Sequence, residues 1–157
     1  MSGVDPSTKA QLVRHLLDHA VLRGDFTLKS GKPTTWFIDA KQTACRPEAM
    51  LLVADAVLTV CPPEATAIGG LTMGADPIAF VAAGVAATRG RPLRVFSVRK
   101  EAKDHGGGGR IAGALDRGDK VVITEDATTR GTSLLEAARV VAELGCEPVL
   151  LCALVDR

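Results

Sequence analysis

The sequence predicts an α/β domain whose central, mostly parallel β-sheet is flanked by helices. The chain has 157 residues, of which 46% are hydrophobic and 24% are charged, so it can form a single domain with a sizeable core. From residue 65 onward, apolar strand-like runs alternate with helical segments, and no repeat or linker interrupts them. Nearly continuous apolar strands that alternate with helices indicate a parallel sheet covered on both faces.

The N-terminal part of the chain predicts two helices separated by a pair of short strands. Apolar residues at helical spacing, with Ser7 or Thr8 as the N-cap, indicate that the first helix is amphipathic. The expected elements are a helix over 7–22, strands over 26–28 and 36–40 joined by a basic, turn-rich loop over 29–33, and a helix over 47–60.

The remainder of the chain predicts successive β–α–β units. Gly69, Gly70 and Gly74 follow the first strand, and Gly145 closes the last helix. The expected elements are strands over 65–68, 93–98, 121–124 and 149–155, with helices over 77–88 and 133–144. Ligands of such sheets bind where the carboxyl ends of the strands lead into loops.

Composition and charge argue against several classes of function. The 19 basic and 18 acidic residues leave a formal charge of +1, so no overall field would hold a nucleic acid or an anionic membrane. With no Tyr and one Trp, the chain also lacks stacking aromatics. The longest apolar run, 77–87, is far shorter than the roughly 20 residues that cross a bilayer. Since no signal peptide is recognisable, we expect a cytoplasmic protein that binds neither nucleic acid nor membrane.

The cysteine and histidine spacings do not form a metal-binding motif. The cysteines include no C-x-x-C pair and no histidine close by, so buried, reduced thiols are expected. His15 and His19 lie four residues apart on one helix face and could share a metal ion, but no third ligand or H-E-x-x-H context accompanies them. Surface histidines are therefore favoured at both positions. The four cysteines are Cys45, Cys61, Cys146 and Cys152.

The clearest chemical signal lies in residues 121–133, V-V-I-T-E-D-A-T-T-R-G-T-S. Glu125 and Asp126 follow a β-branched strand, and a turn rich in hydroxyls then enters a helix. The free N–H groups and positive dipole end of that helix suit a phosphate. The carboxylates are placed to accept hydrogen bonds from vicinal hydroxyls, so the segment indicates a sugar phosphate, although an acidic turn with an ordinary helix cap gives the same pattern. The absence of Gly-Lys-Ser/Thr argues against a P-loop NTPase.

This segment resembles the phosphoribosyl pyrophosphate (PRPP) binding motif of type I phosphoribosyltransferases. The resemblance implies that Glu125 and Asp126 bind the ribose 2′- and 3′-hydroxyls. Arg130 departs from the family, which usually has a small residue or Thr at that position. The residues implied to surround the 5′-phosphate are Ala127, Thr128, Thr129, Arg130, Gly131, Thr132 and Ser133.

A second segment, residues 99–110, is basic and runs into four consecutive glycines. By composition it would more often be a solvated hairpin than a catalytic lid. Its sequence R-K-E-A-K-D-H-G-G-G-G nevertheless resembles the flap of orotate phosphoribosyltransferases, which closes over the active site of the neighbouring subunit. The resemblance therefore implies a homodimer in which four catalytic side chains contact the pyrophosphate: Arg99, Lys100, Lys103 and His105.

The N-terminal and C-terminal ends of the chain resemble the same family. F-T-L-K-S-G-K, residues 26–32, resembles its N-terminal hood, in which Lys29 reaches PRPP and the segment beginning at Trp36 covers the pyrimidine ring. V-D-R at the end of the chain resembles the strand end whose arginine binds the orotate carboxylate. The residues implied to bind orotate are Phe37, Ile38, Thr129 and Arg157.

Residues 69–77, G-G-L-T-M-G-A-D-P, resemble the pyrophosphate loop of the family. The resemblance implies contacts to PRPP from Thr72, Met73 and Gly74. Several members of the family have Lys where this chain has Met73.

The resemblance implies a single domain over 1–157, with a hood over approximately 1–45 and a core over approximately 46–157. Members usually continue past the final arginine, so a fragment or a shortened member is expected. The implied reaction joins orotate and PRPP to give orotidine 5′-monophosphate and pyrophosphate, in the biosynthesis of UMP. Mg²⁺ would bind mainly through PRPP, with no direct protein ligand. The alternatives are a PRPP-binding regulator and a phosphoribosyltransferase for another nucleobase.

Overall fold

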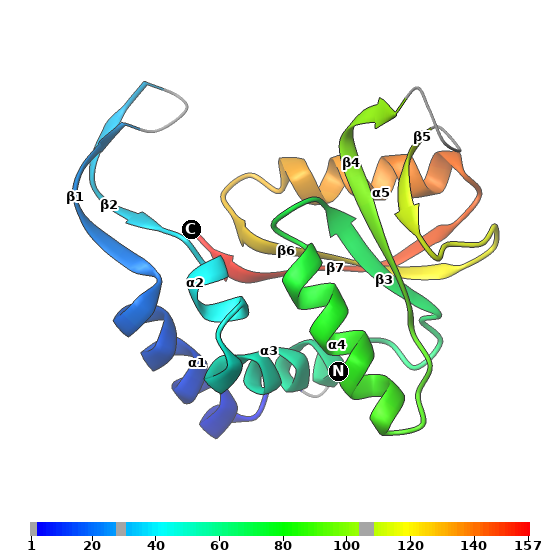
Figure 1. Cartoon of the computed structure of the whole chain (residues 1–157), viewed down its shortest axis with the longest axis horizontal. Coiled ribbons are helices and arrows are strands. Elements are labelled where there is room, and N and C mark those ends of the chain that lie inside the picture. The colour runs from blue at the N-terminus through cyan, green and yellow to red at the C-terminus, as the bar shows by residue number, and fades with distance from the viewer. Residues whose placement is uncertain (1–2, 28–30, 104–108) are drawn as a thin grey trace.

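The computed structural model describes residues 3–27, 31–103 and 109–157. Its main sheet comprises β3 (Ala67–Leu71), β4 (Arg94–Lys103), β5 (Gly109–Gly113), β6 (Lys120–Thr128) and β7 (Glu147–Asp156). The strand order is β5-β4-β3-β6-β7 (Figure 1), and every neighbouring pair is parallel except β4 with β5. The expected mostly parallel sheet is therefore confirmed.

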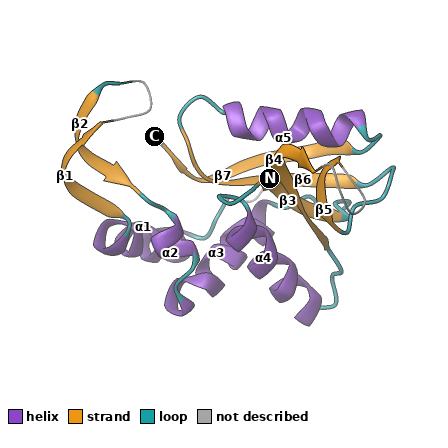
Figure 2. Cartoon of the chain, turned by 45° about the horizontal axis from the view of Figure 1, so that its top comes forward, coloured by secondary structure: helices purple, strands orange, loops and turns teal. Residues whose placement is uncertain are grey.

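Helices cover both faces of this sheet. They are α1 (Pro6–His19), α2 (Lys41–Ala44), α3 (Pro47–Val60), α4 (Asp76–Thr88) and α5 (Thr132–Glu143). Figure 2 shows α5 on one face and α3 and α4 on the other. Ile68 and Val122 belong to the core under α1, α3 and α4, whereas Val121 and Ile123 belong to the core under α5. Because successive strand residues point to opposite faces, apolar strands bury side chains in both cores.

A separate two-stranded ribbon stands beside the sheet. It consists of β1 (Val21–Thr27) and β2 (Pro33–Ile38), which are antiparallel and pair Leu22 with Phe37. Most of its side chains are exposed. In both ribbon views the end of β7 lies next to β2 (Figures 1 and 2). The ribbon therefore flanks the edge of the sheet at which the parallel strands end.

Strands β3, β4, β6 and β7 all extend beyond their predicted ends, and β4 and β6 do so by the most residues. β6 was expected over 121–124 but continues to Thr128, because its pairing with β7 extends to Thr128 opposite Asp156. β4 was expected over 93–98 but continues to Lys103, because the unexpected strand β5 pairs with it. The acidic pair consequently lies inside β6 and not in the loop after it.

The first helix also differs from its prediction. It ends at His19 instead of residue 22, because Val21 and Leu22 pair with β2 as part of β1. The N-cap is Asp5, whose carboxylate accepts a hydrogen bond from the Thr8 backbone N–H at 3.0 Å. The helix predicted over 47–60 has the bounds of α3, whereas α2 was not predicted.

The four cysteines are free, but they are not all buried. Cys61 and Cys146 are buried, Cys152 is half-buried and Cys45 is exposed, so the expectation of buried thiols is wrong for Cys45. Among the described residues, no helix is long and apolar enough to cross a membrane.

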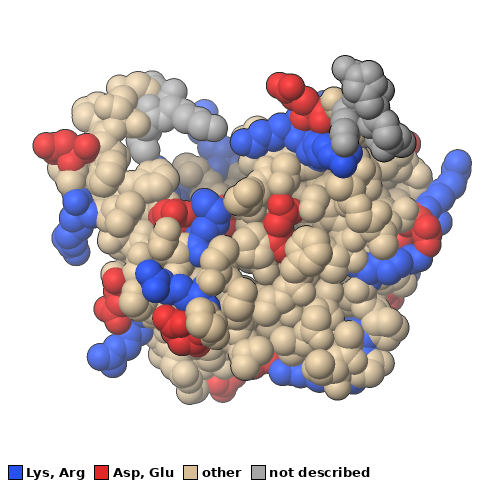
Figure 3. Space-filling model, viewed as in Figure 1, with Lys and Arg blue, Asp and Glu red and all other residues tan. Residues whose placement is uncertain are grey.

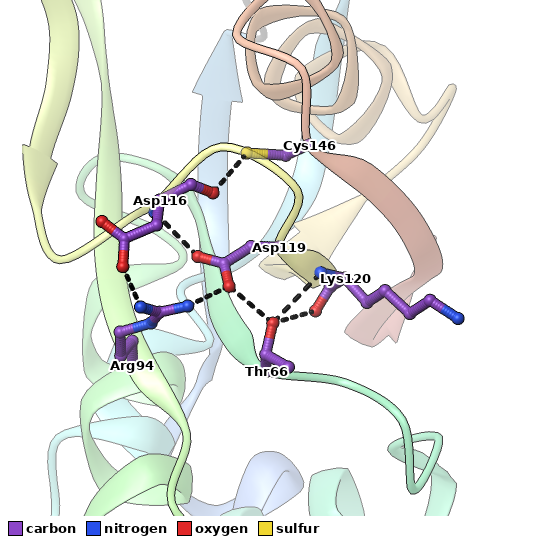
Figure 4. Close-up of polar contacts among 6 residues, drawn as sticks. All are labelled: Thr66, Arg94, Asp116, Asp119, Lys120 and Cys146. Atoms are coloured by element: carbon purple, nitrogen blue, oxygen red, sulfur yellow. Dashed lines mark hydrogen bonds and ion pairs between the residues drawn. The ribbon is translucent and has the colours of Figure 1, made fainter.

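A buried carboxylate, that of Asp119, joins the starts of three strands at the edge opposite the acidic pair (Figure 4). It accepts hydrogen bonds from the Thr66 hydroxyl at 2.7 Å and the Asp116 backbone N–H at 2.8 Å, and it pairs with Arg94. Burial alone would raise the pKa of Asp119, but the hydrogen bonds from Asp116 and Thr66 and the charge of Arg94 lower it overall. The Cys146 thiol donates to the Asp116 carbonyl at 3.3 Å. Asp119 is therefore expected to stabilise the fold in its ionised form.

We expect Asp119→Asn to lower the free energy of unfolding at pH 7 by roughly 1–3 kcal/mol, because the amide loses the charge and one acceptor. A lowered pKa stabilises the fold above the ordinary Asp pKa, and this contribution is lost as the pH falls. The difference from the parent should therefore hold down to about pH 4 and shrink below it. Urea unfolding at pH 7 and at about pH 3 measures this change. Asp116→Asn, which changes the 72% exposed second partner of Arg94, is the control and should cost less than about 1 kcal/mol. Equal costs for the two variants would contradict the role of Asp119.

Candidate active site

The candidate site lies at the edge of the sheet where β3, β4, β6 and β7 end (Figure 1). The loop between β3 and α4 and the loop between β6 and α5 both leave the sheet there. The surface is hollowed between the β1–β2 ribbon and the β4–β5 side of the molecule, and charged side chains of both signs lie along the hollow (Figure 3). Parallel topology therefore brings the predicted PRPP segments to one edge.

Glu125 and Asp126 are buried, with 6% and 8% of their surface exposed. The Asp126 carboxylate accepts a hydrogen bond from the Ala127 backbone N–H at 2.8 Å and pairs with Lys41 Nζ at 3.1 Å. Lys41 Nζ also pairs with Asp39 at 2.7 Å. The lysine therefore compensates the charge of Asp126 and anchors α2 against β6.

Sequence reasoning missed Lys41 as a residue of the site. It lies in α2, a single helical turn that has no apolar periodicity to predict it. Its partner is 85 residues away in the chain, so local spacing carried no signal of the contact.

The loop after β3 passes directly against the acidic pair at Gly74. A Cβ atom at this position would lie 2.0 Å from Glu125 Oε1 and 2.6 Å from Asp126 Oδ1. A side chain here could be accommodated only if both carboxylates moved. The Thr72–Met73 peptide bond is cis, and the Met73 side chain is 68% exposed. The structure therefore brings the predicted pyrophosphate loop next to the predicted ribose-binding carboxylates.

Asp76 braces this loop from the first turn of α4. Its carboxylate accepts hydrogen bonds from the Thr72 hydroxyl at 2.6 Å and the Ser97 hydroxyl at 2.7 Å. It thereby connects the loop to β4. Since the Thr72 hydroxyl donates to Asp76 and the Thr72 N–H donates to the Val98 carbonyl at 2.9 Å, the backbone N–H groups of Met73 and Gly74 are the better candidates for a contact with an anion.

The N-terminus of α5 has the geometry expected of a phosphate site. Gly131 is the N-cap in a left-handed conformation, with φ of 70°, and its N–H donates to Thr128 Oγ1 at 2.9 Å. Within the described chain, no side chain caps this helix and no acidic residue lies in its first turn. The N–H groups that open α5 therefore keep their capacity to bind an anion. Arg130 is exposed beside them.

The predicted orotate residues meet where β6 and β7 end. The Arg157 backbone N–H donates to the Thr128 carbonyl at 2.9 Å, which places Arg157 beside the loop that begins at Thr129. The Arg157 guanidinium carbon lies 5.4 Å from the centroid of the Trp36 ring, within the range of a cation–π contact. Phe37 instead lies against Phe26, with ring centroids 6.0 Å apart. The contact to the arginine is thus made by Trp36.

The basic segment of residues 99–110, which includes the end of β4 and the start of β5, is only partly described. Arg99 donates to the carbonyls of Gly109 and Ile111 on β5, at 3.4 and 3.3 Å, and Lys100 is exposed. The backbone of Lys103 ends β4. The Lys103 side chain lies outside the described part of the structure, as do His105 and Lys29. The structure thus places the Arg99 guanidinium along β5 and does not bring it to the acidic pair.

A cavity of about 490 Å³ lies between α1, α3 and the end of β7. Its lining is mostly apolar and includes Leu12, Val57 and Leu154, together with Glu125. Neither the Gly74 loop nor the N-terminus of α5 lines it. It is therefore separate from the candidate site, although it reaches one of the two carboxylates.

Burial, and after it the neighbouring Asp126, together raise the pKa of Glu125 to about 7. Hydrogen bonds from the Asp126 N–H, at 3.2 Å from Oε1, and from Ser133 oppose this shift in part. Near neutral pH, Glu125 therefore exchanges between its protonated and ionised forms. The protonated form can donate to a ligand oxygen, and the ionised form can accept from a hydroxyl.

A raised carboxyl pKa predicts that stability falls as the pH rises. The folded chain keeps a proton on Glu125 that the unfolded chain releases, so stability declines between about pH 4.5 and pH 7 and then levels off. Glu125→Gln cannot ionise. Between pH 5 and pH 8 it should therefore gain stability relative to the parent, on the order of 1–3 kcal/mol.

Chemical unfolding at several pH values measures this difference. The matched control is Glu64→Gln, which changes an exposed carboxylate and should follow the parent at each pH. If Glu125→Gln also follows the parent, Glu125 titrates normally.

Comparisons with known proteins identify the family of the chain. No protein-family model matches it. The orotate phosphoribosyltransferase of Streptomyces coelicolor is 41% identical over 150 residues, which cover 95% of this chain and 82% of that relative. The Mycobacterium tuberculosis orotate phosphoribosyltransferase in complex with Fe(III) dicitrate has a TM-score of 0.82 at 34% identity, with 96% of this chain and 85% of that chain covered. The same enzyme in complex with PRPP has a TM-score of 0.76 at 29% identity, with 96% and 83% covered. On this similarity over most of both sequences, the chain belongs to the orotate phosphoribosyltransferase family.

Proposed function

We propose that this chain transfers the 5-phosphoribosyl group of PRPP to orotate, giving orotidine 5′-monophosphate and pyrophosphate. The observation that carries the proposal is the contact between the Gly74 loop and the buried carboxylates of Glu125 and Asp126. The free N-terminus of α5 follows the same strand. One edge of the sheet thus offers acceptors for the ribose hydroxyls beside backbone donors for the 5′-phosphate and for the pyrophosphate.

The ribose 5-phosphate part of PRPP fits the segment from β6 into α5. Glu125 and Asp126 would accept hydrogen bonds from the 2′- and 3′-hydroxyls, and Lys41 would hold the Asp126 carboxylate in place through their ion pair. The 5′-phosphate would bind the backbone N–H groups between Ala127 and Ser133, where the dipole of α5 favours negative charge. The two carboxylates would repel that phosphate, so the sugar ring has to lie between them and the helix.

The pyrophosphate would lie over the loop of Thr72, Met73 and Gly74. Its charge grows as the bond between C1 of the ribose and the pyrophosphate oxygen breaks and the ribose becomes oxocarbenium-like. The orotate nitrogen attacks this electrophilic carbon and forms the new bond to the ribose. The electron pair of the broken bond leaves with the pyrophosphate. Fixed donors and cations around the leaving group lower the barrier because they interact most strongly with the transition state.

The basic flap would supply those cations. We place Arg99, Lys100, Lys103 and His105 of one protomer over the active site of the other in a homodimer, with Lys29 of the hood also on PRPP. Arg99 and Lys100 both precede the end of β4, at the same edge as the acidic pair. Closure of the flap would exclude the water that hydrolyses PRPP.

Mg²⁺ fits this arrangement as an ion held mainly by the substrate. The oxygens of Asp126 already accept from Lys41 and from the Ala127 N–H, and Glu125 is partly protonated near neutral pH. The acidic pair therefore has little capacity for a direct divalent ligand set. When bound through the pyrophosphate and ribose oxygens with several waters, Mg²⁺ would neutralise part of the charge on the leaving group.

Orotate would bind between the C-terminal strand ends and the ribbon. Arg157 would pair with its carboxylate, with Thr129 on the other side. The segment Trp36, Phe37 and Ile38 would cover the ring, and Trp36 is the member that contacts the arginine. A flat anionic base matches a guanidinium held against an indole ring.

Loss of orotate absorbance after addition of PRPP and Mg²⁺ tests the proposed function, with uracil and adenine as parallel acceptors. We expect consumption of orotate alone, because Arg157 recognises the carboxylate that uracil and adenine lack. Consumption of another base would assign a different phosphoribosyltransferase. PRPP binding without any turnover would favour a regulator that senses PRPP.

A further inference from the structure

The strongest unassigned cluster of polar side chains lies where α1 packs against α3. The ring centroids of His15 and His19 are 4.4 Å apart on α1. Glu48 reaches them from the first turn of α3, with its Oε1 at 3.7 Å from His15 Nε2. One ligand atom from each of the three side chains lies within 4.8 Å of the others. We propose that His15, His19 and Glu48 form a site for a divalent transition metal of the zinc class, which braces α1 against α3.

His15 is not the surface histidine that its spacing suggested. Its side chain is only 12% exposed, and its Nδ1 lies 3.1 Å from the hydroxyl oxygen of the fully buried Thr43. When Nδ1 carries the proton and donates to Thr43, Nε2 presents its lone pair toward Glu48. Metal-binding histidines are oriented in the same way: one ring nitrogen binds the metal, and the other donates a hydrogen bond to a neighbouring acceptor.

The Nε2 atom of His15 is buried and has no hydrogen-bond partner among the described residues. Glu48 is an acceptor when ionised, so it cannot donate to that lone pair. A buried nitrogen without a partner costs free energy. A metal ion would satisfy the nitrogen and the carboxylate together.

The distance between the ligand atoms of His15 and Glu48 is close to that in a bound zinc site, and the His19 ligand atom lies within 4.8 Å of both. Ligand atoms of a tetrahedral zinc site lie about 3.4 Å apart, since each bond is roughly 2.0–2.1 Å long. The 3.7 Å between His15 Nε2 and Glu48 Oε1 is near this value. His19 and Glu48 are both exposed, so their side chains can rotate to bring the ligand atoms closer to the metal without movement of the backbone.

The donor set selects the class of metal. Two imidazoles and one carboxylate suit zinc and similar first-row ions, whereas Mg²⁺ prefers oxygen ligands alone. Three protein ligands leave a fourth position for water. Arg46 places a positive charge near Glu48, which reduces the attraction for a cation, but the bound ion would still face one carboxylate and two neutral rings.

The position of the site points to a structural role. Leu12 of α1 packs into the same core as Val53 and Val57 of α3, one helical turn from His15. A metal bridging the two helices would fix α1, which leads directly into the β1–β2 ribbon. Binding only to the folded chain would raise its melting temperature with metal concentration.

Calorimetric titration of the metal-free chain with zinc, in the presence of Mg²⁺, tests the site. We expect one zinc ion per chain, a higher melting temperature with zinc, and the visible spectrum of a tetrahedral site when Co²⁺ replaces zinc. Glu48→Gln and His19→Gln, both at exposed positions, should each weaken zinc binding by at least about tenfold and abolish the thermal shift. Thr43→Val should weaken it by roughly tenfold, because His15 loses the partner that orients its ring.

The matched control is Cys45→Ser, which removes the exposed thiol closest in sequence to Thr43. It should bind zinc as the parent does. Failure of the parent to bind zinc, full binding by Glu48→Gln and His19→Gln, or loss of binding in Cys45→Ser would each overturn the proposal.

Discussion

The burial of two adjacent carboxylates on one strand is the constraint around which the site is built. Glu125 and Asp126 cannot both be ionised in a buried position without compensation. Lys41 compensates Asp126, and Glu125 keeps its proton up to about pH 7. Gly74 leaves the carboxylates room to stay where they are. The placement of α2 and of the loop after β3 therefore follows from the electrostatics of β6.

The parallel topology of the sheet brings further segments to the edge where the acidic pair lies. Because the main strands end on the same side, the Gly74 loop, the acidic pair and Arg157 meet although they are far apart in the chain. Charges of opposite sign are separated along that edge: carboxylates on β6, free N–H groups at α5 and basic residues in the last part of β4. Such a separation matches a ligand whose hydroxyls and phosphates lie at different ends.

Much of the fold could be predicted from sequence because its signals are local. The apolar strand runs, the helix over 47–60 with Pro47 at its first position, and the acidic segment before α5 can be recognised from neighbouring residues alone. Contacts between residues that are far apart in the sequence carried no such signal. Lys41 reaches Asp126 from an unpredicted turn, Glu48 joins His15 from another helix, and β6 lengthens only because β7 pairs with it.

The most direct measurement is the affinity for PRPP of Gly74→Ala beside that of Gly84→Ala. A Cβ at Gly74 would displace both carboxylates, whereas Gly84 lies at an exposed position of α4 with nothing within 4 Å of a Cβ. Calorimetry should show PRPP binding at least roughly tenfold weaker in Gly74→Ala, equivalent to about 1.4 kcal/mol. Gly84→Ala should bind like the parent and unfold with about 0.5–1 kcal/mol more free energy. Unchanged PRPP affinity in a folded Gly74→Ala would show that the acidic pair does not hold the ribose.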